Sequence, residues 1–321
     1  MAGAGSLVAG VDLGGTKIQT AVLRGRRIVG RSRVETPRTG AEAVIAAIVE
    51  SVRTSVQEAG ESLSDLTATG VGTPGTIDEG EGSVSNSPNV PGFESRPVPL
   101  AAELSKALGV EVNVDNDVRV AVRGEWKRGA GRSYRDFLGV FVGTGVGGGL
   151  VLDGHLRLGQ GAAGEIGHTI VKDGGRRCSC GKDGHLESYA GRARMEATAR
   201  RWMGDGRKTR LFQIMEKKGR DRVTSGVIEE ALAEHDHVAT ELVDDAVWAL
   251  GIALANAANL LDLEAIIIGG GLGDRLGKPF VDRVAEAAAP RLHVPERPPR
   301  FLTTELGDLA GAVGAAVLAG G

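Results

Sequence analysis

The sequence contains one unusual arrangement twice: an apolar strand that runs directly into a glycine-rich turn and returns as a second strand. The first copy is GVDLGGTKIQTAVLRG at residues 10–25, and the second is FLGVFVGTGVGGGLVLDGHL at residues 137–156. Glycine makes up 50 of the 321 residues, roughly twice its usual share. Glycine permits positive φ and lets the backbone approach a ligand closely. Because there are two copies and not three or more, the pattern predicts a duplicated domain rather than a solenoid.

The remaining pattern alternates helices and strands. A four-residue apolar period predicts a helix over residues 41–59. Predicted strands near residues 67–71 and 110–114 are followed by GTPG and DND, and the strand at 265–268 runs into GGGLG. Residues 190–245 are charged and predicted to be helical, with Ser225 and Asp236 as candidate N-caps. This order predicts an α/β protein with two domains.

Charge and composition exclude several classes of protein. The formal net charge is −3, so there is no overall basic excess for nucleic acid. The longest uncharged apolar run, residues 246–261, has 16 residues and includes two asparagines, which is too short and too polar to span a bilayer. Cys178 and Cys180 are one residue apart, so a disulfide between them would be strained. We therefore expect a cytoplasmic protein with reduced thiols or a metal site, and no nucleic-acid or membrane partner.

Three glycine-rich segments follow predicted apolar strands: DLGGTK at residues 12–17, GTGVGGG at 143–149 and GGGLG at 269–273. Backbone N–H groups in such turns can bind phosphate oxygens, and Asp12 can hold Mg²⁺ through water. Each segment alone could be an ordinary structural turn. Together they predict a nucleotide polyphosphate bound in a cleft.

Asn116 and Asp117 come directly after a predicted strand. A carboxylate at such a position could act as the general base of a phosphoryl transfer. The same pair is also typical of a helix N-cap before VRVAVRGEW. The two roles are compatible, and spacing alone favours the cap.

The ordered motifs DLGGTK, GTPG, SPNVPGF, VDNDVRVA, GTGVGGG, GEIGH, CSCG and IIIGGG resemble the ROK family of sugar kinases and sugar-responsive repressors, from about residue 8 to 318. The resemblance implies an actin-like or hexokinase-like fold of two related α/β domains around an ATP and sugar cleft. It places residues 1–117 in the first domain, with a helix near 307–320 returning to it, and residues 118–306 in the second. Within the family, the ATP-dependent kinases of glucose are most similar.

The resemblance also implies residue roles. Asp117 would be the base that activates the 6-hydroxyl of glucose. The sugar would be bound by Gly75, Asn89, Asn116, Asp117, Glu165, His168 and Glu187. ATP with Mg²⁺ would be bound by Asp12, Gly14, Gly15, Thr16, Lys17, Thr144, Gly145, Gly270 and Gly271. Phe93 stands where the family often has tryptophan, which leaves the choice of sugar open.

A metal site is predicted in the loop at residues 165–187. The family pattern is a histidine followed by C-x-C-G-x-x-G-C, and here the last cysteine is His185. The ligands of a structural Zn²⁺ would be His168, Cys178, Cys180 and His185. Two imidazoles and two thiolates form a closed tetrahedral site. The alternative is that the two thiols lie near each other by chance.

Other functions remain open at this point. ROK repressors carry a DNA-binding domain before the first glycine turn, and only 11 residues precede Asp12, where a three-helix DNA reader needs roughly 60. We therefore expect a kinase. Its sugar could instead be fructose, N-acetylmannosamine or allose, and its donor could be polyphosphate. A homodimer or homotetramer is expected from the resemblance.

Overall fold

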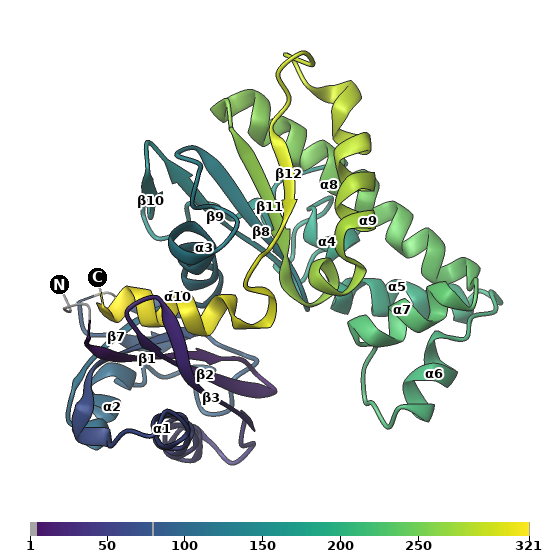
Figure 1. Ribbon diagram of the computed structural model, residues 1–321. Helices are drawn as coiled ribbons and strands as arrows, with labels where there is room; N and C mark the ends of the chain where they lie inside the picture. Colours follow the sequence, from purple (N-terminus) through teal and green to yellow (C-terminus); the bar gives the residue numbers. More distant parts are fainter. Residues whose placement is uncertain (1–4, 79, 321) are drawn as a thin grey trace. The chain divides into compact units, whose positions relative to one another are not determined.

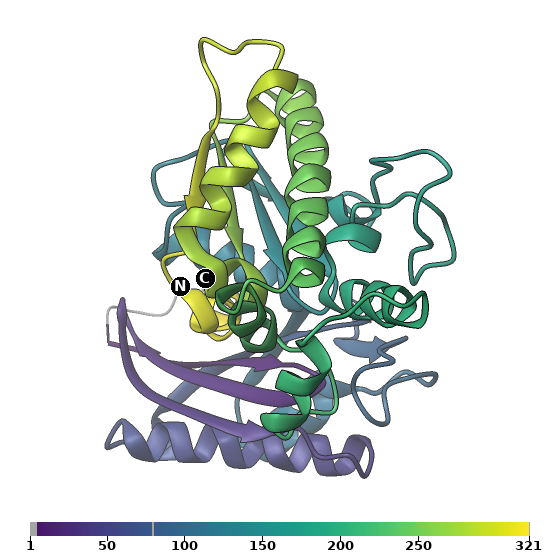
Figure 2. The same ribbon diagram turned by 90° about the vertical axis from the view of Figure 1, so that its right-hand side faces the viewer.

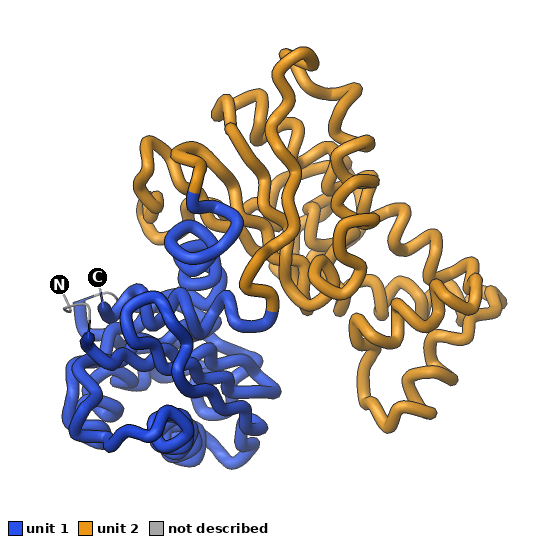
Figure 3. The backbone as a smooth tube through the Cα atoms, viewed as in Figure 1, with its two compact units in different colours: residues 1–132, 308–321 blue, residues 133–307 orange. Residues whose placement is uncertain are grey.

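The computed structural model describes residues 5–78 and 80–320, and the chain divides into two compact units (Figure 3). Unit 1 comprises Met1–Arg132 and Asp308–Gly321, and unit 2 comprises Ser133–Gly307. We expected the first domain to end at residue 117, but unit 1 continues to residue 132. The physical reason is that helix α3 (Asp117–Arg128) packs closely against helix α10 (Ala310–Gly320), which belongs to the same unit.

The sheet of unit 1 has five strands in the order β3-β2-β1-β4-β7 (Figure 1). The first three in the chain, β1 (Leu7–Leu13), β2 (Lys17–Arg24) and β3 (Arg27–Glu35), pair antiparallel. The other two, β4 (Leu66–Thr73) and β7 (Glu111–Asn116), continue the sheet in parallel with β1. A small hairpin of β5 (Thr76–Asp78) and β6 (Ser83–Ser85) follows β4.

Helices cover both faces of this sheet. Apolar residues on one face, including Leu7, Val11 and Val71, form a core with α1 (Ala41–Glu58) and α2 (Leu100–Leu108). Figure 2 shows α1 running along β2 and β3. Helix α10 packs on the other face, against β1 and β4. A Cβ at Gly70 would lie 1.8 Å from the Ala315 carbonyl oxygen, so this glycine allows the helix to approach the strand directly.

The sheet of unit 2 repeats the arrangement of unit 1. Its order is β10-β9-β8-β11-β12. Strands β8 (Phe137–Val142), β9 (Val146–Leu152) and β10 (His155–Arg157) pair antiparallel, and β11 (Ala265–Gly269) and β12 (Arg300–Thr303) continue in parallel. Three antiparallel strands followed by two parallel ones thus occur in both units. The predicted duplication of an α/β domain is confirmed.

The helices of unit 2 form a core with the strands β8 and β11. The longest is α8 (His237–Leu261), which lies beside α9 (Gly270–Ala288) in both ribbon views (Figures 1 and 2). The others are α4 (Glu187–Ala190), α5 (Arg192–Gly204), α6 (Leu211–Lys217) and α7 (Ser225–Ala233). Short 3-10 turns occupy Leu63–Asp65, Ile166–His168, Ala289–Arg291 and Gly307–Leu309. Among the described residues, no helix combines the length and apolar character needed to cross a membrane.

Two local expectations differ from the structure. Thr224 rather than Ser225 caps α7, because the Thr224 hydroxyl accepts the N–H of Val227, whereas Asp236 caps α8 as predicted. We expected a glycine turn at the third segment, but α9 begins at Gly270 directly after β11. Its glycines therefore place a helix N-terminus at the end of a buried strand.

Candidate functional site

The first predicted phosphate turn lies between β1 and β2 in unit 1. Asp12 is near the end of β1, and Gly14 closes the turn by donating its N–H to the Lys17 carbonyl at 2.9 Å. A Cβ at Gly15 would lie 2.2 Å from the Asn89 carbonyl oxygen. The structure therefore brings the predicted phosphate turn and the predicted sugar-binding residue Asn89 into direct contact. Only glycine fits at residue 15 without moving the Asn89 backbone.

Asp12 occupies an electrostatically unfavourable position for a carboxylate. Burial, together with the negative charges of Asp117 and Asp308, raises its pKa to about 7, and Lys17 opposes this rise. Gly311 in α10 leaves room for the carboxylate, since a Cβ there would lie 2.7 Å from the Asp12 Cγ. A cation beside Asp12 would relieve this repulsion, so the site suits a bound divalent metal ion.

Asn116 and Asp117 lie at the junction of β7 and α3. The Asn116 side-chain oxygen accepts the N–H groups of Val118 and Arg119 at 3.0 and 3.2 Å, so Asn116 is the N-cap of α3. Asp117 is the first residue of the helix and also accepts the Val118 N–H, at 2.9 Å. The cap that the sequence suggested is therefore present. It also holds the carboxylate of Asp117 close enough to Asp12 to influence its pKa.

The other predicted residues of unit 1 surround this turn and the β5–β6 hairpin. Lys17 forms an ion pair with Asp308 at 3.4 Å and donates to Gln19. Thr16 is exposed, and its carbonyl oxygen accepts the N–H of Thr36. Gly75 has a φ of 116°, and a Cβ there would lie 2.6 Å from the Ser85 carbonyl oxygen, so the bend after β4 requires glycine.

In unit 2 the second predicted phosphate turn is shorter than its glycine run. Strand β8 ends at Val142 and β9 begins at Val146, so only residues 143–145 form the turn and the later glycines belong to β9. The Glu187 Oε2 accepts the N–H of Val146 at 3.0 Å. A Cβ at Gly145 would lie 2.3 Å from that oxygen, so the close approach of the carboxylate requires a glycine.

Glu187 also contacts the cysteine loop. Its Oε1 accepts the hydroxyl of Ser179 at 2.6 Å, and Ser179 lies between the two cysteines. One carboxylate thus joins the loop to the start of β9. Sequence reasoning assigned Glu187 to the sugar but missed Ser179, because no motif indicates a contact to the residue between the two thiols.

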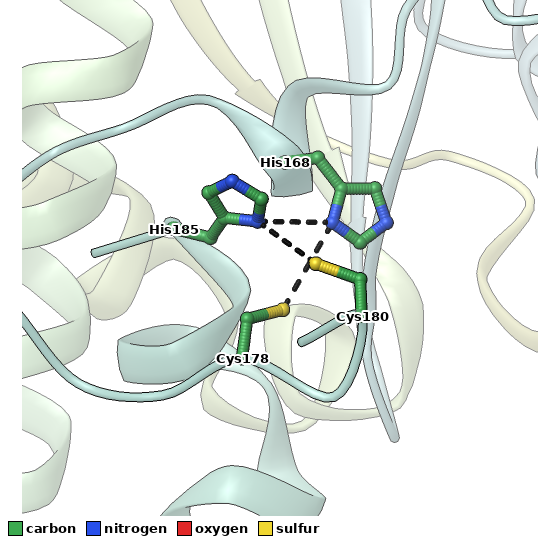
Figure 4. Close-up of side chains that lie close together, drawn as sticks. All are labelled: His168, Cys178, Cys180 and His185. Atoms are coloured by element: carbon green, nitrogen blue, oxygen red, sulfur yellow. Dashed lines mark hydrogen bonds between the residues drawn. The ribbon is translucent and has the colours of Figure 1, made fainter. Parts of the chain in front are cut away.

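Four side chains of the loop converge as predicted for a metal centre (Figure 4). Their candidate ligand atoms all lie within 4.8 Å of one another. The Nδ1 atoms of His168 and His185 are 3.4 Å apart, Cys180 Sγ is 3.3 Å from His185 Nδ1, and Cys178 Sγ is 3.9 Å from His168 Nδ1. Tetrahedral zinc with nitrogen and sulfur ligands separates them by about 3.3–3.8 Å. The donor set therefore suits Zn²⁺, and the separations of 3.4 and 3.3 Å lie in this range, whereas that of 3.9 Å would have to shorten around an ion.

The protonation chemistry of the cluster also suits a metal. Burial, followed by the charge of nearby His168, lowers the pKa of His185 and favours the neutral imidazole that can ligate. Burial raises the pKa of the Cys178 thiol, a cost that a bound cation would offset. His168 and Cys180 are exposed, whereas Cys178 and His185 are buried. Glu165, also exposed, immediately precedes the 3-10 turn that carries His168.

Gly270 and Gly271 open α9 at the end of β11. Gly270 has a φ of 80°, and a Cβ there would lie 2.8 Å from the Val142 nitrogen. The structure therefore brings the third glycine segment against the end of β8, beside the second. Sequence reasoning missed Arg192, whose guanidinium donates to the Thr144 hydroxyl at 3.0 Å. An arginine in a charged helical segment carries no local signal for such a contact.

Comparison with known proteins covers nearly the whole chain. The model of the ROK family matches residues 8–321. A glucokinase of Halalkalibacterium halodurans is 35% identical over 95% of this chain and 92% of its own. An N-acetylmannosamine kinase of Haemophilus influenzae is 29% identical over 95% of this chain and 93% of its own. The crystal structure of a ROK family glucokinase from Streptomyces griseus in complex with glucose and AMPPNP is 33% identical, with a TM-score of 0.81 over 98% of this chain and 99% of that one. The chain belongs to the ROK family.

Proposed function

We propose that this protein is an ATP-dependent glucokinase, which transfers the γ-phosphate of ATP to the 6-hydroxyl of glucose. The observation that carries the proposal is the 35% identity to a glucokinase along 95% of the chain. The related S. griseus glucokinase holds glucose and AMPPNP, an ATP analogue, in its crystal structure. The N-acetylmannosamine kinases, at 29% identity, make a kinase of that sugar the second candidate.

Asp117 is the proposed general base. Its carboxylate would accept the proton of the sugar 6-hydroxyl as the oxygen forms a bond to the γ-phosphorus. The bond from that phosphorus to the β,γ-bridging oxygen breaks, and ADP leaves with the electron pair. Asp117 lies in the first turn of α3, and Asn116 caps that helix, so the Asp117 carboxylate is held in one position. We further propose that Gly75, Asn89, Glu165, His168 and Glu187 take part in sugar binding.

The glycine turns and Asp12 would bind ATP, the phosphoryl donor. Asp12 would hold Mg²⁺ through water, and the metal would supply charge neutralisation on the phosphates. The N–H groups of residues 15, 16, 144 and 145, and of the start of α9, would be the donors for phosphate oxygens. Those of Gly14 and Gly143 bond to carbonyls within their own turns. The raised pKa of Asp12 supports this assignment, since a carboxylate that is costly to ionise alone gains most from a nearby cation.

We also propose a structural zinc ion bound by His168, Cys178, Cys180 and His185. Its role would be to hold the loop so that Ser179 reaches Glu187, and thereby to support the first residues of β9. Binding through Nδ1 leaves Nε2 of His168 available to contact the sugar. We expect a homodimer or homotetramer, to be measured by light scattering after size-exclusion chromatography.

The function is tested by a coupled assay on the purified protein with a panel of hexoses and two donors. We expect glucose with Mg-ATP to give the highest kcat/KM and glucose 6-phosphate as the product. A preference for N-acetylmannosamine, fructose or allose would replace the assigned sugar. A preference for inorganic polyphosphate would replace the assigned donor.

A further inference from the structure

Arg192, the first residue of α5, is held by three neutral acceptors. Its Nε donates to the Val223 carbonyl at 3.1 Å, its Nη1 to the Ser225 hydroxyl at 3.1 Å and its Nη2 to the Thr144 hydroxyl at 3.0 Å. Within residues 5–78 and 80–320, no carboxylate forms an ion pair with it. A positive charge is therefore fixed in one orientation by neutral groups, and the negative charge of Glu196 acts on it only from beyond ion-pair distance.

Because Arg192 is the donor in these hydrogen bonds, the hydroxyls of Thr144 and Ser225 can still donate their own protons. Arginine has no acceptor, so Thr144 and Ser225 must accept from it. Each hydroxyl proton then remains available to donate, and the adjacent cation strengthens that donor. The hydroxyl of Ser225 has this role because Thr224, rather than Ser225, caps α7. A cation flanked by two hydroxyl donors is suited to an oxyanion.

The backbone places this group where two glycine segments meet. The Arg192 N–H donates to the Gly143 carbonyl at 3.1 Å, so the arginine also closes the turn that carries Thr144. A Cβ at Gly271 would lie 3.4 Å from the Ser225 hydroxyl oxygen and 3.5 Å from Arg192 Nη1. The start of α9 is therefore in contact with the same group. Of the three side chains Thr144 is exposed, Arg192 is half-buried and Ser225 is buried, so the group is open to solvent on the side of Thr144.

We propose that Arg192, with Thr144 and Ser225, binds the phosphate chain of the phosphoryl donor. This inference rests on the proposed kinase function and extends it to two residues, Arg192 and Ser225, that no motif indicated. A phosphate chain is common to ATP and to inorganic polyphosphate, so the group recognises the chain and not the nucleoside. Arginine suits the task because its planar fork can hold both hydroxyls and still face a phosphate oxygen.

Calorimetry with adenosine, Mg-ADP and Mg-tripolyphosphate tests the proposal. Arg192→Ala is expected to weaken the binding of Mg-ADP and of tripolyphosphate at least tenfold and to leave adenosine within twofold. Ser225→Ala should weaken the two phosphate ligands about threefold, and Ser225→Thr, which keeps the hydroxyl, should restore them. Arg194→Ala, which removes an arginine of the same helix that takes no part in these bonds, should bind all three ligands as the wild type does.

Steady-state kinetics separates this role from a merely structural one. Arg192→Ala and Arg192→Lys should raise the KM for ATP while the KM for glucose stays unchanged. Equal weakening of adenosine and Mg-ADP, or no weakening of either, would overturn the proposal. If Arg192→Ala does not fold, as judged by circular dichroism, Ser225→Ala and Arg192→Lys test the proposal instead. The result to compare is again the loss of affinity for Mg-ADP and tripolyphosphate relative to adenosine.

Different results would contradict the proposed glucokinase function and the proposed phosphate site at Arg192. A wild type that binds Mg-ADP but phosphorylates no glucose would contradict the proposed function and leave the phosphate site to be judged by the variants. A wild type that binds neither Mg-ADP nor tripolyphosphate would contradict both. Preferential binding of tripolyphosphate over Mg-ADP, still dependent on Arg192, would support the site and identify polyphosphate as the donor.

Discussion

The carboxylate of Asp117, at the start of α3, acts on that of Asp12, near the end of β1, although the two residues are far apart in the chain. The negative charge of Asp117 contributes, after burial, to raising the pKa of Asp12 to about 7. β1 and β7 lie on either side of β4, and each acid is at or just beyond the carboxyl end of its strand. Parallel pairing through β4 therefore gathers both acids at one edge of the sheet.

This relationship predicts a pH-dependent penalty on stability. The pKa of Asp12 rises from 3.8 in the unfolded chain to about 7 in the folded protein. Between these values the folded protein binds more protons, so its free energy of unfolding falls as the pH rises. Asp12→Asn should therefore stabilise the metal-free protein by ~2 kcal/mol at pH 8 and have little effect at pH 4. Urea unfolding at both pH values measures the difference.

The matched control is Asp205→Asn, which removes an exposed carboxylate at the end of α5. It should leave the unfolding free energy unchanged at both pH values. An Asp12→Asn protein that is no more stable than the wild type at pH 8 would show that the Asp12 carboxylate is not destabilised in the folded state.

Asp117 and Asn116 should separate into a catalytic and a structural effect. Asp117→Asn removes the proposed base and should lower kcat about 100- to 10,000-fold. It should not lower the unfolding free energy, because Asn116 still caps α3 and the repulsion on the Asp12 carboxylate is relieved. Asn116→Ala removes the acceptor for two N–H groups and should cost about 1 kcal/mol of stability. Coupled assays and urea unfolding on both variants test this. Near wild-type turnover in Asp117→Asn would refute the assigned base.

Gly70 should tolerate no side chain. Its ideal Cβ would lie 1.8 Å from the Ala315 carbonyl oxygen, so Gly70→Ala would push α10 away from β4. Because the obstacle is backbone, we expect a loss of ~2–3 kcal/mol. Gly204→Ala is the control, since its Cβ meets nothing within 4 Å and it ends a helix. Thermal unfolding measures the melting temperature of both variants. Equal melting temperatures for Gly70→Ala and Gly204→Ala would argue against direct packing of α10 on the sheet.

The metal centre predicts about one zinc per chain in purified protein, measured by elemental analysis. Cys178→Ser should lose the metal, and His185→Cys should retain it, because three thiolates and one imidazole also form a tetrahedral site. Chelation should lower the melting temperature and reduce activity, since the loop carries Ser179 to Glu187. Zinc-free protein with full activity and unchanged stability would rule out this role.

Much of the fold could be predicted from local pattern. The two strand–glycine–strand segments and the apolar run of α8 appear in the sequence because hydrophobic periodicity and turn chemistry act over a few residues. The order of the glycine motifs and the Asn-Asp motif along the chain indicates membership of the ROK family. The four metal candidates come from the resemblance to the family's histidine and cysteine pattern, and in the structure their ligand atoms converge.

Other features depend on contacts between distant segments. No local pattern shows that the segment at 269–273 begins a helix rather than a turn, because glycine permits both. The end of unit 1 at residue 132 follows from the packing of α3 on α10, a contact between the middle and the end of the chain.

The sequence by itself determined most of the strands and helices and the positions of the glycine turns, because those properties follow from neighbouring residues. Only the tertiary structure decided that Asp117 would raise the pKa of Asp12, that Glu187 would join Ser179 to Val146, and that Arg192 would orient Thr144. Electrostatic coupling and hydrogen bonding depend on distances in space, and strand order and helix packing set those distances.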